Sequence, residues 1–285
     1  MEIQKNVLLR PYSTFKIGGV AQFFGLAKKQ EDLIQGVKKA LSEKWKFYIL
    51  GGGSNVLLPS EGYNGLIIVN RTNELKIDET KVTVDSGYTF SLFIKNMLKE
   101  NLGGLEKLFG IPGTIGGAIF QNAGAYGQEI GNFVEAVNVI DEQGEIRKLL
   151  AKDLKFGYRD SVFKKTKYVI LSVEFNLIPV DKDAIKDRLK EMTAQRTSDK
   201  PYGKSAGSFF KNPSSLIKAG KLIDEAGLKG KRIGDALISP EHGNFIINVG
   251  NATSDDIIKL SGFIKEEIYK KNKIKLDEEI QILNY

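Results

Sequence analysis

The sequence predicts an α+β protein. Helical and strand-like patterns are intermixed along the chain, and several neighbouring strands have the character of antiparallel hairpin partners. The 285 residues, 41% of them hydrophobic, can bury a substantial core and fit two or three compact units. Self-similarity at a fixed period is absent, so we expect no repeat architecture.

The first expected unit begins with a helix over residues 30–44, where apolar residues recur at helical spacing. An apolar strand at 47–50 then enters a glycine-rich loop, and a further strand is expected at 65–70. From about residue 76 onward the pattern starts again, which predicts a second unit. Its expected elements are a strand at 81–85, a helix at 90–100, a glycine-rich stretch at 103–127 and strands at 136–141 and 168–178.

After Pro179 the composition becomes helical and charged, so we place a domain boundary near residue 180. Thr253 and Asp256 have the spacing of a capping box, which predicts the start of a long amphipathic helix. The expected elements of this last part are helices at 184–196, 215–226 and 255–271 and strands at 244–249 and 279–283.

Composition restricts the available chemistry. The chain has no cysteine, which rules out disulfides, thiolate metal ligands and a thiol nucleophile. Its one histidine, His242, leaves no histidine dyad and no multi-histidine metal site. Catalysis must therefore come from serine, tyrosine, lysine, arginine or carboxylate side chains, or from a cofactor, and we expect no metal.

Charge and hydropathy indicate the surroundings of the protein. The apolar runs are much shorter than the roughly 20 residues of a membrane span, and residues 1–5 show no secretory signal, so we expect a cytoplasmic protein. The net charge of +7 is scattered rather than clustered, which favours anionic small ligands over nucleic acid. A solvated lysine-rich surface is the alternative. Nothing in the sequence indicates an obligate protein partner.

Two glycine-rich segments are candidate cofactor loops. The first follows a strand, and its backbone N–H groups can approach an anion closely, although a plain tight turn is the alternative; it consists of Gly51, Gly52, Gly53, Ser54 and Asn55. The second offers small residues and two hydrogen-bonding side chains to a bulky flat ligand, or else forms a buried turn; its candidates are Gly113, Thr114, Gly117, Asn122 and Ala125. Two such loops among 30 glycines favour a large dinucleotide cofactor.

Three further segments carry polar groups with chemical potential. Ser208 lies in a flexible turn without a partner histidine, so it can act as a proton donor but not as a triad nucleophile, or it satisfies backbone groups in a turn. Arg159 can clamp a carboxylate or pair with Asp160. Strand alternation at Glu278 and Glu279 would turn one of these carboxylates toward a site.

Together these segments resemble the UDP-N-acetylenolpyruvoylglucosamine reductases of peptidoglycan synthesis. The matching residues occur in family order and span nearly the whole chain: 13–19 (STFKIGG), 50–57, 104–127, 157–161 (GYRDS), 206–213 (AGSFFKNP), 227–230, 242–245 (HGNF) and Glu279. The short interval between Arg159 and Ser208 resembles the subgroup that lacks a tyrosine-bearing loop insertion.

The resemblance implies a two-part FAD-binding region of the vanillyl-alcohol-oxidase/PCMH type and a C-terminal α+β substrate domain. The implied boundaries are 1–72 for the first FAD subdomain, with 276–285 as a candidate completing strand, 73–179 for the second and 180–285 for the substrate domain. FAD would bind non-covalently at the two glycine-rich loops, with NADPH as reductant and a UDP-sugar as substrate.

The resemblance also implies residue roles. Arg159 and Glu279 would stabilise negative charge on the reacting enolpyruvyl group, and Ser208 would protonate its C2. Tyr158, Lys200, Asn212 and Lys229 would contact the anionic substrate. Two positions depart from the family pattern: Gln281 stands where an arginine is frequent, and Asp235 where a glycine is expected. Both changes would alter substrate affinity, which the Michaelis constant of Gln281→Arg would test.

Three other functions compete with this interpretation. A different flavin oxidase or dehydrogenase could use the same FAD scaffold, but the Ser208 segment and Glu279 disfavour it. A non-catalytic UDP-sugar binder is disfavoured because all three catalytic residue types are present. A nucleic-acid-binding module is supported only by the net charge, and salt-sensitive retention of DNA would be needed to support it.

Overall fold

The computed structural model describes residues 1–181, 201 and 203–284. These residues form two compact units, each assembled from separate stretches of chain. Unit 1 comprises Met1–Gln4, Phe23–Gly52 and 65–181, and unit 2 comprises Lys5–Gln22, Gly53–Asn64, 201 and 203–284. Helices and strands are intermixed, which confirms the predicted α+β class. The division at residues 72 and 179 stays a prediction, and the expected helix at 184–196 lies outside the described residues.

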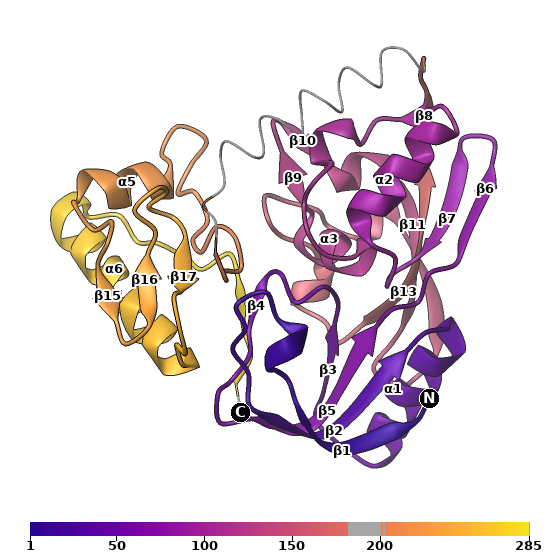
Figure 1. The fold of residues 1–285 in the computed structure, drawn as a ribbon. Coiled ribbons are helices and arrows are strands. Elements are labelled where there is room, and N and C mark those ends of the chain that lie inside the picture. Colours follow the sequence, from indigo (N-terminus) through magenta and orange to yellow (C-terminus); the bar gives the residue numbers. More distant parts are fainter. Residues whose placement is uncertain (182–200, 202, 285) are drawn as a thin grey trace. The chain divides into compact units, whose positions relative to one another are not determined.

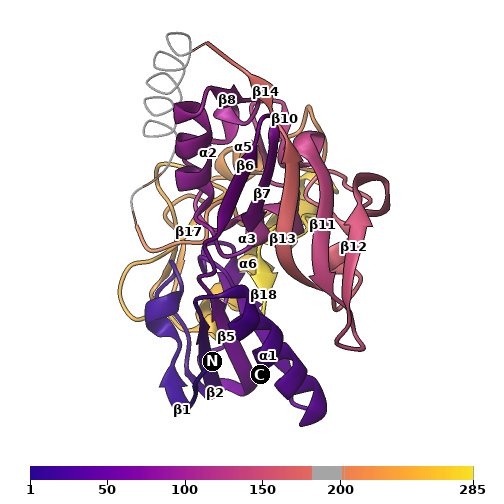
Figure 2. The ribbon, with the colours of Figure 1, turned by 90° about the vertical axis from the view of Figure 1, so that its right-hand side faces the viewer.

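The centre of unit 1 is an antiparallel sheet with the order β12-β11-β13-β7-β6 (Figure 2). Its strands are β6 (Leu75–Asp78), β7 (Lys81–Asp85), β11 (Val134–Ile140), β12 (Ile146–Leu150) and β13 (Val169–Asn176). Three of them confirm the expected strands, with ends shifted by at most two residues. β6 and β12 were not expected, because their mostly exposed residues lack a clear apolar alternation.

Helices α2 (Phe90–Lys99) and α3 (Ile115–Gln121) lie on one face of this sheet (Figures 1 and 2). The ring of Phe93 in α2 stacks in a tilted arrangement on Phe175 of β13, with 5.2 Å between centroids. α2 confirms the expected helix, whereas α3 was not expected, because Gly116 and Gly117 lower helix propensity.

A second sheet has the order β1-β2-β5-β3, and the boundaries of the two units cross its first three strands. Its strands are β1 (Ile3–Leu8), β2 (Val20–Ala27), β3 (Phe47–Leu50) and β5 (Tyr63–Asn70). Within unit 1, β3 and β5 pair in parallel, and Leu33 and Val37 of α1 (Gln30–Ser42) pack with the β5 residues Leu66 and Ile68. The expected helix and two strands are confirmed; β1 and β2 were not expected.

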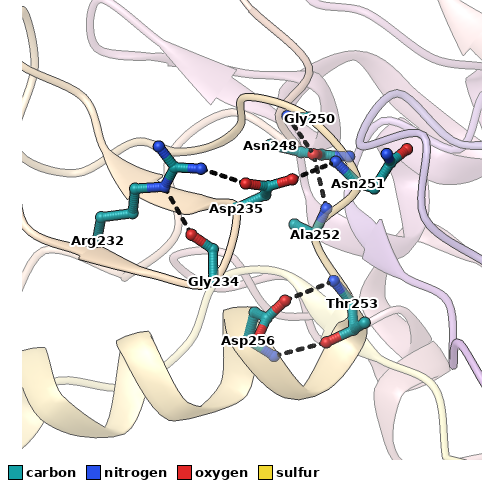
Figure 3. A network of polar contacts seen from close by, with 9 residues as sticks. All are labelled: Arg232, Gly234, Asp235, Asn248, Gly250, Asn251, Ala252, Thr253 and Asp256. Carbon is teal, nitrogen blue, oxygen red and sulfur yellow. Dashed lines mark hydrogen bonds and ion pairs between the residues drawn. The ribbon is translucent and has the colours of Figure 1, made fainter.

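Unit 2 contains a three-stranded antiparallel sheet and two helices (Figure 1). These elements are α5 (Ala219–Glu225), β15 (Arg232–Ile233), β16 (Ala236–Ile238), β17 (Ile246–Asn248) and α6 (Ser254–Asn272). The capping box is confirmed at α6, where Thr253 Oγ1 accepts from the Asp256 N–H (3.1 Å) and the Thr253 N–H donates to Asp256 Oδ2 (2.9 Å) (Figure 3). α5 begins four residues later than expected, because 214–218 remain exposed and outside the helix.

Short strands complete the described part of the chain. In unit 2, β4 (Val56–Leu57) pairs in parallel with β18 (Gln281–Ile282). In unit 1, β8 (Leu102–Gly103) pairs with β14 (Ile178–Pro179), and β9 (Gly124–Ala125) pairs with β10 (Gln128–Glu129). Among the described residues, none of the helices has the length and apolar character that crossing a bilayer requires.

Candidate active site

The two glycine-rich loops come together in unit 1. A Cβ atom on Gly51 would lie 2.5 Å from Thr114 Oγ1, and one on Gly52 would lie 2.6 Å from Gly113 Cα. These distances are shorter than any real Cβ contact, so side chains are excluded at both positions. The loop after β3 therefore packs tightly before the start of α3, with the Gly52 backbone against that of Gly113 and Gly51 against the Thr114 side chain.

The first turn of α3 leaves room beside this contact. Thr114 caps the helix by accepting a hydrogen bond from the Gly117 N–H at 3.4 Å. Gly117 is exposed, and a Cβ there would meet only Thr114 Oγ1, at 3.7 Å. The backbone next to both loops is thus open to a large flat ligand, and the residues present fit one.

The second half of the first loop, Gly53 to Asn55, belongs to unit 2. Gly53 has φ +65°, and a Cβ on it would overlap the carbonyl oxygen of Tyr12, so only glycine fits. Asn55 lies against the chain end: its Nδ2 donates to the Glu279 carbonyl at 3.3 Å, and its carbonyl accepts from the Gln281 N–H at 2.9 Å. Ser54 between them is partly buried.

Ser208 and Glu279 lie on neighbouring extended segments of unit 2. Ser208 forms an antiparallel bridge with Phe245. The next residue, Phe209, donates its N–H to Asn244 O and accepts from the Glu279 N–H, each at 2.8 Å. The side chains of Ser208 and Glu279 are partly buried. The backbone of Glu279 therefore pairs with that of the residue after Ser208, although 71 residues separate Ser208 and Glu279 along the chain (279 − 208).

Arg159 occupies a tight turn of unit 1. Mutual backbone hydrogen bonds of 3.0 and 3.1 Å between Gly157 and Asp160 close the turn, and Arg159 has φ +52°. Its guanidinium donates to the Gly124 carbonyl at 2.7 Å and lies 5.3 Å from the centroid of the half-exposed Tyr158 ring. Asp160 forms an ion pair with Lys165 at 3.4 Å.

The other expected site residues have contacts of their own. Asn212 Oδ1 accepts from the Ala219 N–H at the start of α5 (3.0 Å), and Lys229 Nζ pairs with Asp224 at 2.8 Å. Asn122 is buried at the end of α3, and Ala125 pairs with Gln128 in the β9–β10 hairpin. Lys200 lies outside the described residues.

The candidates therefore fall into two groups, one in each unit. Unit 1 holds Gly51, Gly52, Gly113, Thr114, Gly117, Asn122, Ala125, Tyr158 and Arg159. Unit 2 holds Gly53, Ser54, Asn55, Ser208, Asn212, Lys229 and Glu279.

Two supporting residues were not singled out as site residues by sequence reasoning. Asn244 is buried and bonds the backbone of Phe210 in both directions, with its Nδ2 donating to the carbonyl (2.8 Å) and its Oδ1 accepting from the N–H (2.9 Å). Glu129 accepts a 2.7 Å hydrogen bond from Asn122. The HGNF motif contained Asn244, but no pattern in the sequence indicated its partner.

Asp235, one of the two departures from the family pattern, has a structural role (Figure 3). Its carboxylate accepts from the Arg232 guanidinium and from the Asn251 N–H, the latter at 2.7 Å. The Asn251 N–H and the Arg232 side chain lower the pKa of Asp235. The side chain thus ties the β15–β16 turn to residues 249–251 within unit 2.

Comparisons with known proteins agree with this geometry. A family model described as an FAD binding domain matches residues 21–150, and one described as UDP-N-acetylenolpyruvoylglucosamine reductase, C-terminal domain, matches residues 197–283. The UDP-N-acetylenolpyruvoylglucosamine reductase of Clostridium novyi is 38% identical over 99% of this chain and 92% of that protein. The Chlamydia felis protein of the same name is 38% identical over 99% and 95%. The crystal structure of the Thermus caldophilus enzyme, 33% identical, superposes with a TM-score of 0.86 and full coverage of both chains.

Fold and site thus define a protein with an FAD-binding domain and a separate C-terminal domain. More narrowly, the identity over nearly the full length shows that the chain belongs to the UDP-N-acetylenolpyruvoylglucosamine reductase family. The expected family, with an FAD-binding domain followed by a C-terminal domain, is confirmed.

Proposed function

We propose that this protein reduces UDP-N-acetylglucosamine enolpyruvate to UDP-N-acetylmuramate, with FAD as cofactor and NADPH as reductant. The observation that carries the proposal is the 2.8 Å hydrogen bond from the Glu279 N–H to the Phe209 carbonyl. It joins the backbone of Glu279 to that of the residue after Ser208, in a chain that belongs to this reductase family.

The cofactor loops would be Gly51–Asn55 and 113–117, because their glycines let a ligand approach the backbone closely. Bound FAD would supply hydride-transfer chemistry, with NADPH as the hydride source and C3 of the enolpyruvyl group as the acceptor. NADPH leaves before the sugar nucleotide enters, so turnover follows a ping-pong scheme.

Three residues would stabilise the negative charge on the reacting enolpyruvyl group and supply the proton to its C2. Hydride addition at C3 builds negative charge at C2 and on the attached carboxylate. Arg159 binds that carboxylate through its guanidinium, and Glu279 stabilises the charge through a bridging hydrogen-bond donor. Ser208 holds a proton at Oγ and delivers it to C2, a transfer that depends on proximity more than on a low pKa.

Tyr158, Lys200, Asn212 and Lys229 would hold the remainder of the substrate. A net charge of +7 favours the approach of two anionic ligands, the UDP-sugar and NADPH. The product is a peptidoglycan precursor, so the protein would serve cell-wall synthesis in the cytoplasm and, through it, cell shape and division.

An anaerobic flavin assay tests this function. Purified protein is loaded with FAD, its visible band is bleached with NADPH, and UDP-N-acetylglucosamine enolpyruvate is then added. We expect rapid return of the oxidised band without oxygen. A protein that takes up no FAD would contradict the proposal. A flavin that NADPH bleaches but the enolpyruvyl sugar does not reoxidise would instead favour another FAD-dependent oxidase or dehydrogenase.

A further inference from the structure

The side-chain amide of Asn122 forms three hydrogen bonds inside unit 1. It is 1% exposed and sits at the end of α3 with φ +44°, a conformation that asparagine tolerates well. Its Nδ2 donates to Glu129 Oε2 at 2.7 Å and to the Gly157 carbonyl at 3.0 Å, while its Oδ1 accepts from the Gly131 N–H at 3.1 Å. Both amide hydrogens are therefore used within the protein.

The chemistry of these partners fixes which way the amide points. A carbonyl only accepts and an ionised carboxylate only accepts, so the NH2 end of Asn122 must face Gly157 and Glu129. The Gly131 N–H only donates, so it requires the oxygen end. Two acceptors on one side and one donor on the other leave a single satisfactory orientation of the amide.

Gly157, whose carbonyl accepts the hydrogen bond from Asn122, is the first residue of the turn that carries Arg159. Arginine at φ +52° is strained, and such a conformation persists only where surrounding contacts impose it. Three more side-chain hydrogen bonds hold the same turn: Ser161 Oγ to Phe120 O (2.7 Å), Arg159 to Gly124 O (2.7 Å) and Lys164 Nζ to Arg159 O (2.6 Å).

The bond from Ser161 ends on Phe120 in α3, and the bond from Arg159 ends on Gly124, just after the helix. Asn122, which bonds Gly157, lies between these two residues. The turn at Gly157–Asp160 is thus fastened to residues 120–124, and the opposite end of the same short helix begins at the cofactor loop contact of Thr114 with Gly51. α3 is therefore a rigid connection between the two parts of the candidate site in unit 1.

We propose that Asn122 is a positioning residue for Arg159, acting through Gly157, and that Glu129 orients its amide. The proposal rests on the proposed function in one respect, namely that Arg159 binds the substrate carboxylate. Without the bond to Gly157, the turn can shift and relax its strain, and the guanidinium loses its alignment. Misplacement by about 1 Å can cost on the order of 10²-fold in rate.

The test compares the two half-reactions in Asn122→Ala. On protein fully loaded with FAD, we expect reoxidation of reduced flavin by the enolpyruvyl sugar to slow by about 10-fold to 100-fold more than bleaching by NADPH does. Asn138→Ala is the matched control: it removes another side-chain amide of unit 1, which donates to Ser172 Oγ at 3.1 Å and has no bond to the turn. Equal slowing of both half-reactions in Asn122→Ala would overturn the proposal.

A double-mutant cycle shows whether Asn122 acts through Arg159. In an Arg159→Ala background, Asn122→Ala should have almost no further effect on reoxidation, because the group it positions is gone. Multiplied effects of the two changes would contradict the proposal. Asn122→Leu should resemble Asn122→Ala, since neither side chain has an N–H to donate to the Gly157 carbonyl.

Amide hydrogen exchange gives a readout that does not depend on activity. Asn122→Ala should speed exchange in peptides that cover 157–161, while peptides from β11 and β13 keep the rates of the parent protein. Unchanged exchange at the turn would overturn the positioning role. If the parent protein itself fails to reduce the enolpyruvyl sugar, the proposed function fails, and the exchange result still decides whether Asn122 holds the turn.

Discussion

The Asn244 side chain bonds both backbone groups of Phe210: it donates to the carbonyl at 2.8 Å and accepts from the N–H at 2.9 Å. Phe210 is buried and follows Ser208 by two residues, so this clamp fixes the segment that presents the candidate proton donor. The Asn244 side chain thereby fixes the backbone two residues after Ser208.

Asn244→Ala should therefore lower stability strongly. It leaves a buried N–H and a buried carbonyl without their partner, which costs about 2–4 kcal/mol in the free energy of unfolding. Urea denaturation measures the loss. Asn251→Ala is the control, because its side chain accepts from Arg10 at the exposed surface, and a change within about 0.5 kcal/mol is expected there. Equal losses in both variants would contradict the clamp.

Ser208→Ala should separate proton transfer from hydride transfer to the flavin. We expect kcat to fall by about 10²-fold to 10⁴-fold, the range for a lost general acid, with bleaching by NADPH unaffected. Rapid-mixing absorbance at the flavin band measures both steps. Ser214→Ala is the matched control on the same segment, since Ser214 Oγ only accepts from the exposed Ile217 N–H. Full activity in Ser208→Ala would remove this residue from the mechanism.

Asp85 should make the free energy of unfolding decrease as the pH rises, which is the reverse of the usual effect of a carboxyl group. Burial raises the pKa of Asp85 above 3.8, and the nearby Glu74 and Glu31 add to the rise, against hydrogen bonds from the Glu74 N–H and the Gln30 side chain. The folded state then holds this proton more tightly than the unfolded state does. Its contribution to stability is therefore present at low pH and is lost as the pH rises above 3.8 through the raised pKa.

Denaturation curves of Asp85→Asn and the parent protein across about pH 3 to 7 measure this dependence. The stability of the parent protein relative to Asp85→Asn should be greatest at the acid end and should fall as the pH rises through the raised pKa of Asp85. Asp141 provides the opposite case, because the backbone N–H groups of Glu145 and Gln143 and the Arg147 side chain lower its pKa. Asp141→Asn should lose a contribution that is present above pH 3.8 and fades below it. A parallel offset at every pH in Asp85→Asn would refute the assignment.

Asp235→Gly, which restores the residue expected from the family pattern, should lower the melting temperature. It removes the hydrogen bonds to Arg232 and to the Asn251 N–H that join the β15–β16 turn to residues 249–251. Differential scanning calorimetry measures the shift. The Michaelis constant for the enolpyruvyl sugar is measured beside it, and a change there without any thermal shift would favour a role in substrate affinity instead.

Local sequence signals predicted the elements whose own pattern is strong. The Thr253–Asp256 capping box marked the start of α6 correctly, and an apolar run marked β3 at Phe47–Leu50. α3 escaped prediction because Gly116 and Gly117 oppose a helix locally; it forms because Ile115 and Ile119 are buried in the core of unit 1.

The arrangement of the candidate site depended on non-local pairing. Sequence reasoning proposed Ser208 and Glu279 as separate residues, but the pairing of their backbone segments arises from hydrogen bonds at Phe209 that no motif encodes. The same holds for Asn122, which was expected at the cofactor: its hydrogen-bonding capacity suggested a ligand contact, while its partner Gly157 lies 35 residues away. The individual roles of the site residues stay predictions.

The discontinuity of unit 2 has a consequence for synthesis on the ribosome. Residues 5–22 and 53–64 emerge early, yet they belong with the chain beyond residue 201, and Asn55 bonds Glu279 across 224 positions. These early segments cannot pack into the core of unit 2 until the last strand has been translated. Until then, apolar side chains such as Phe15 and Leu57 lack the core residues that cover them in the folded protein. Such late closure slows folding and exposes the nascent protein to aggregation, so its yield should depend on chaperones more than its modest size suggests.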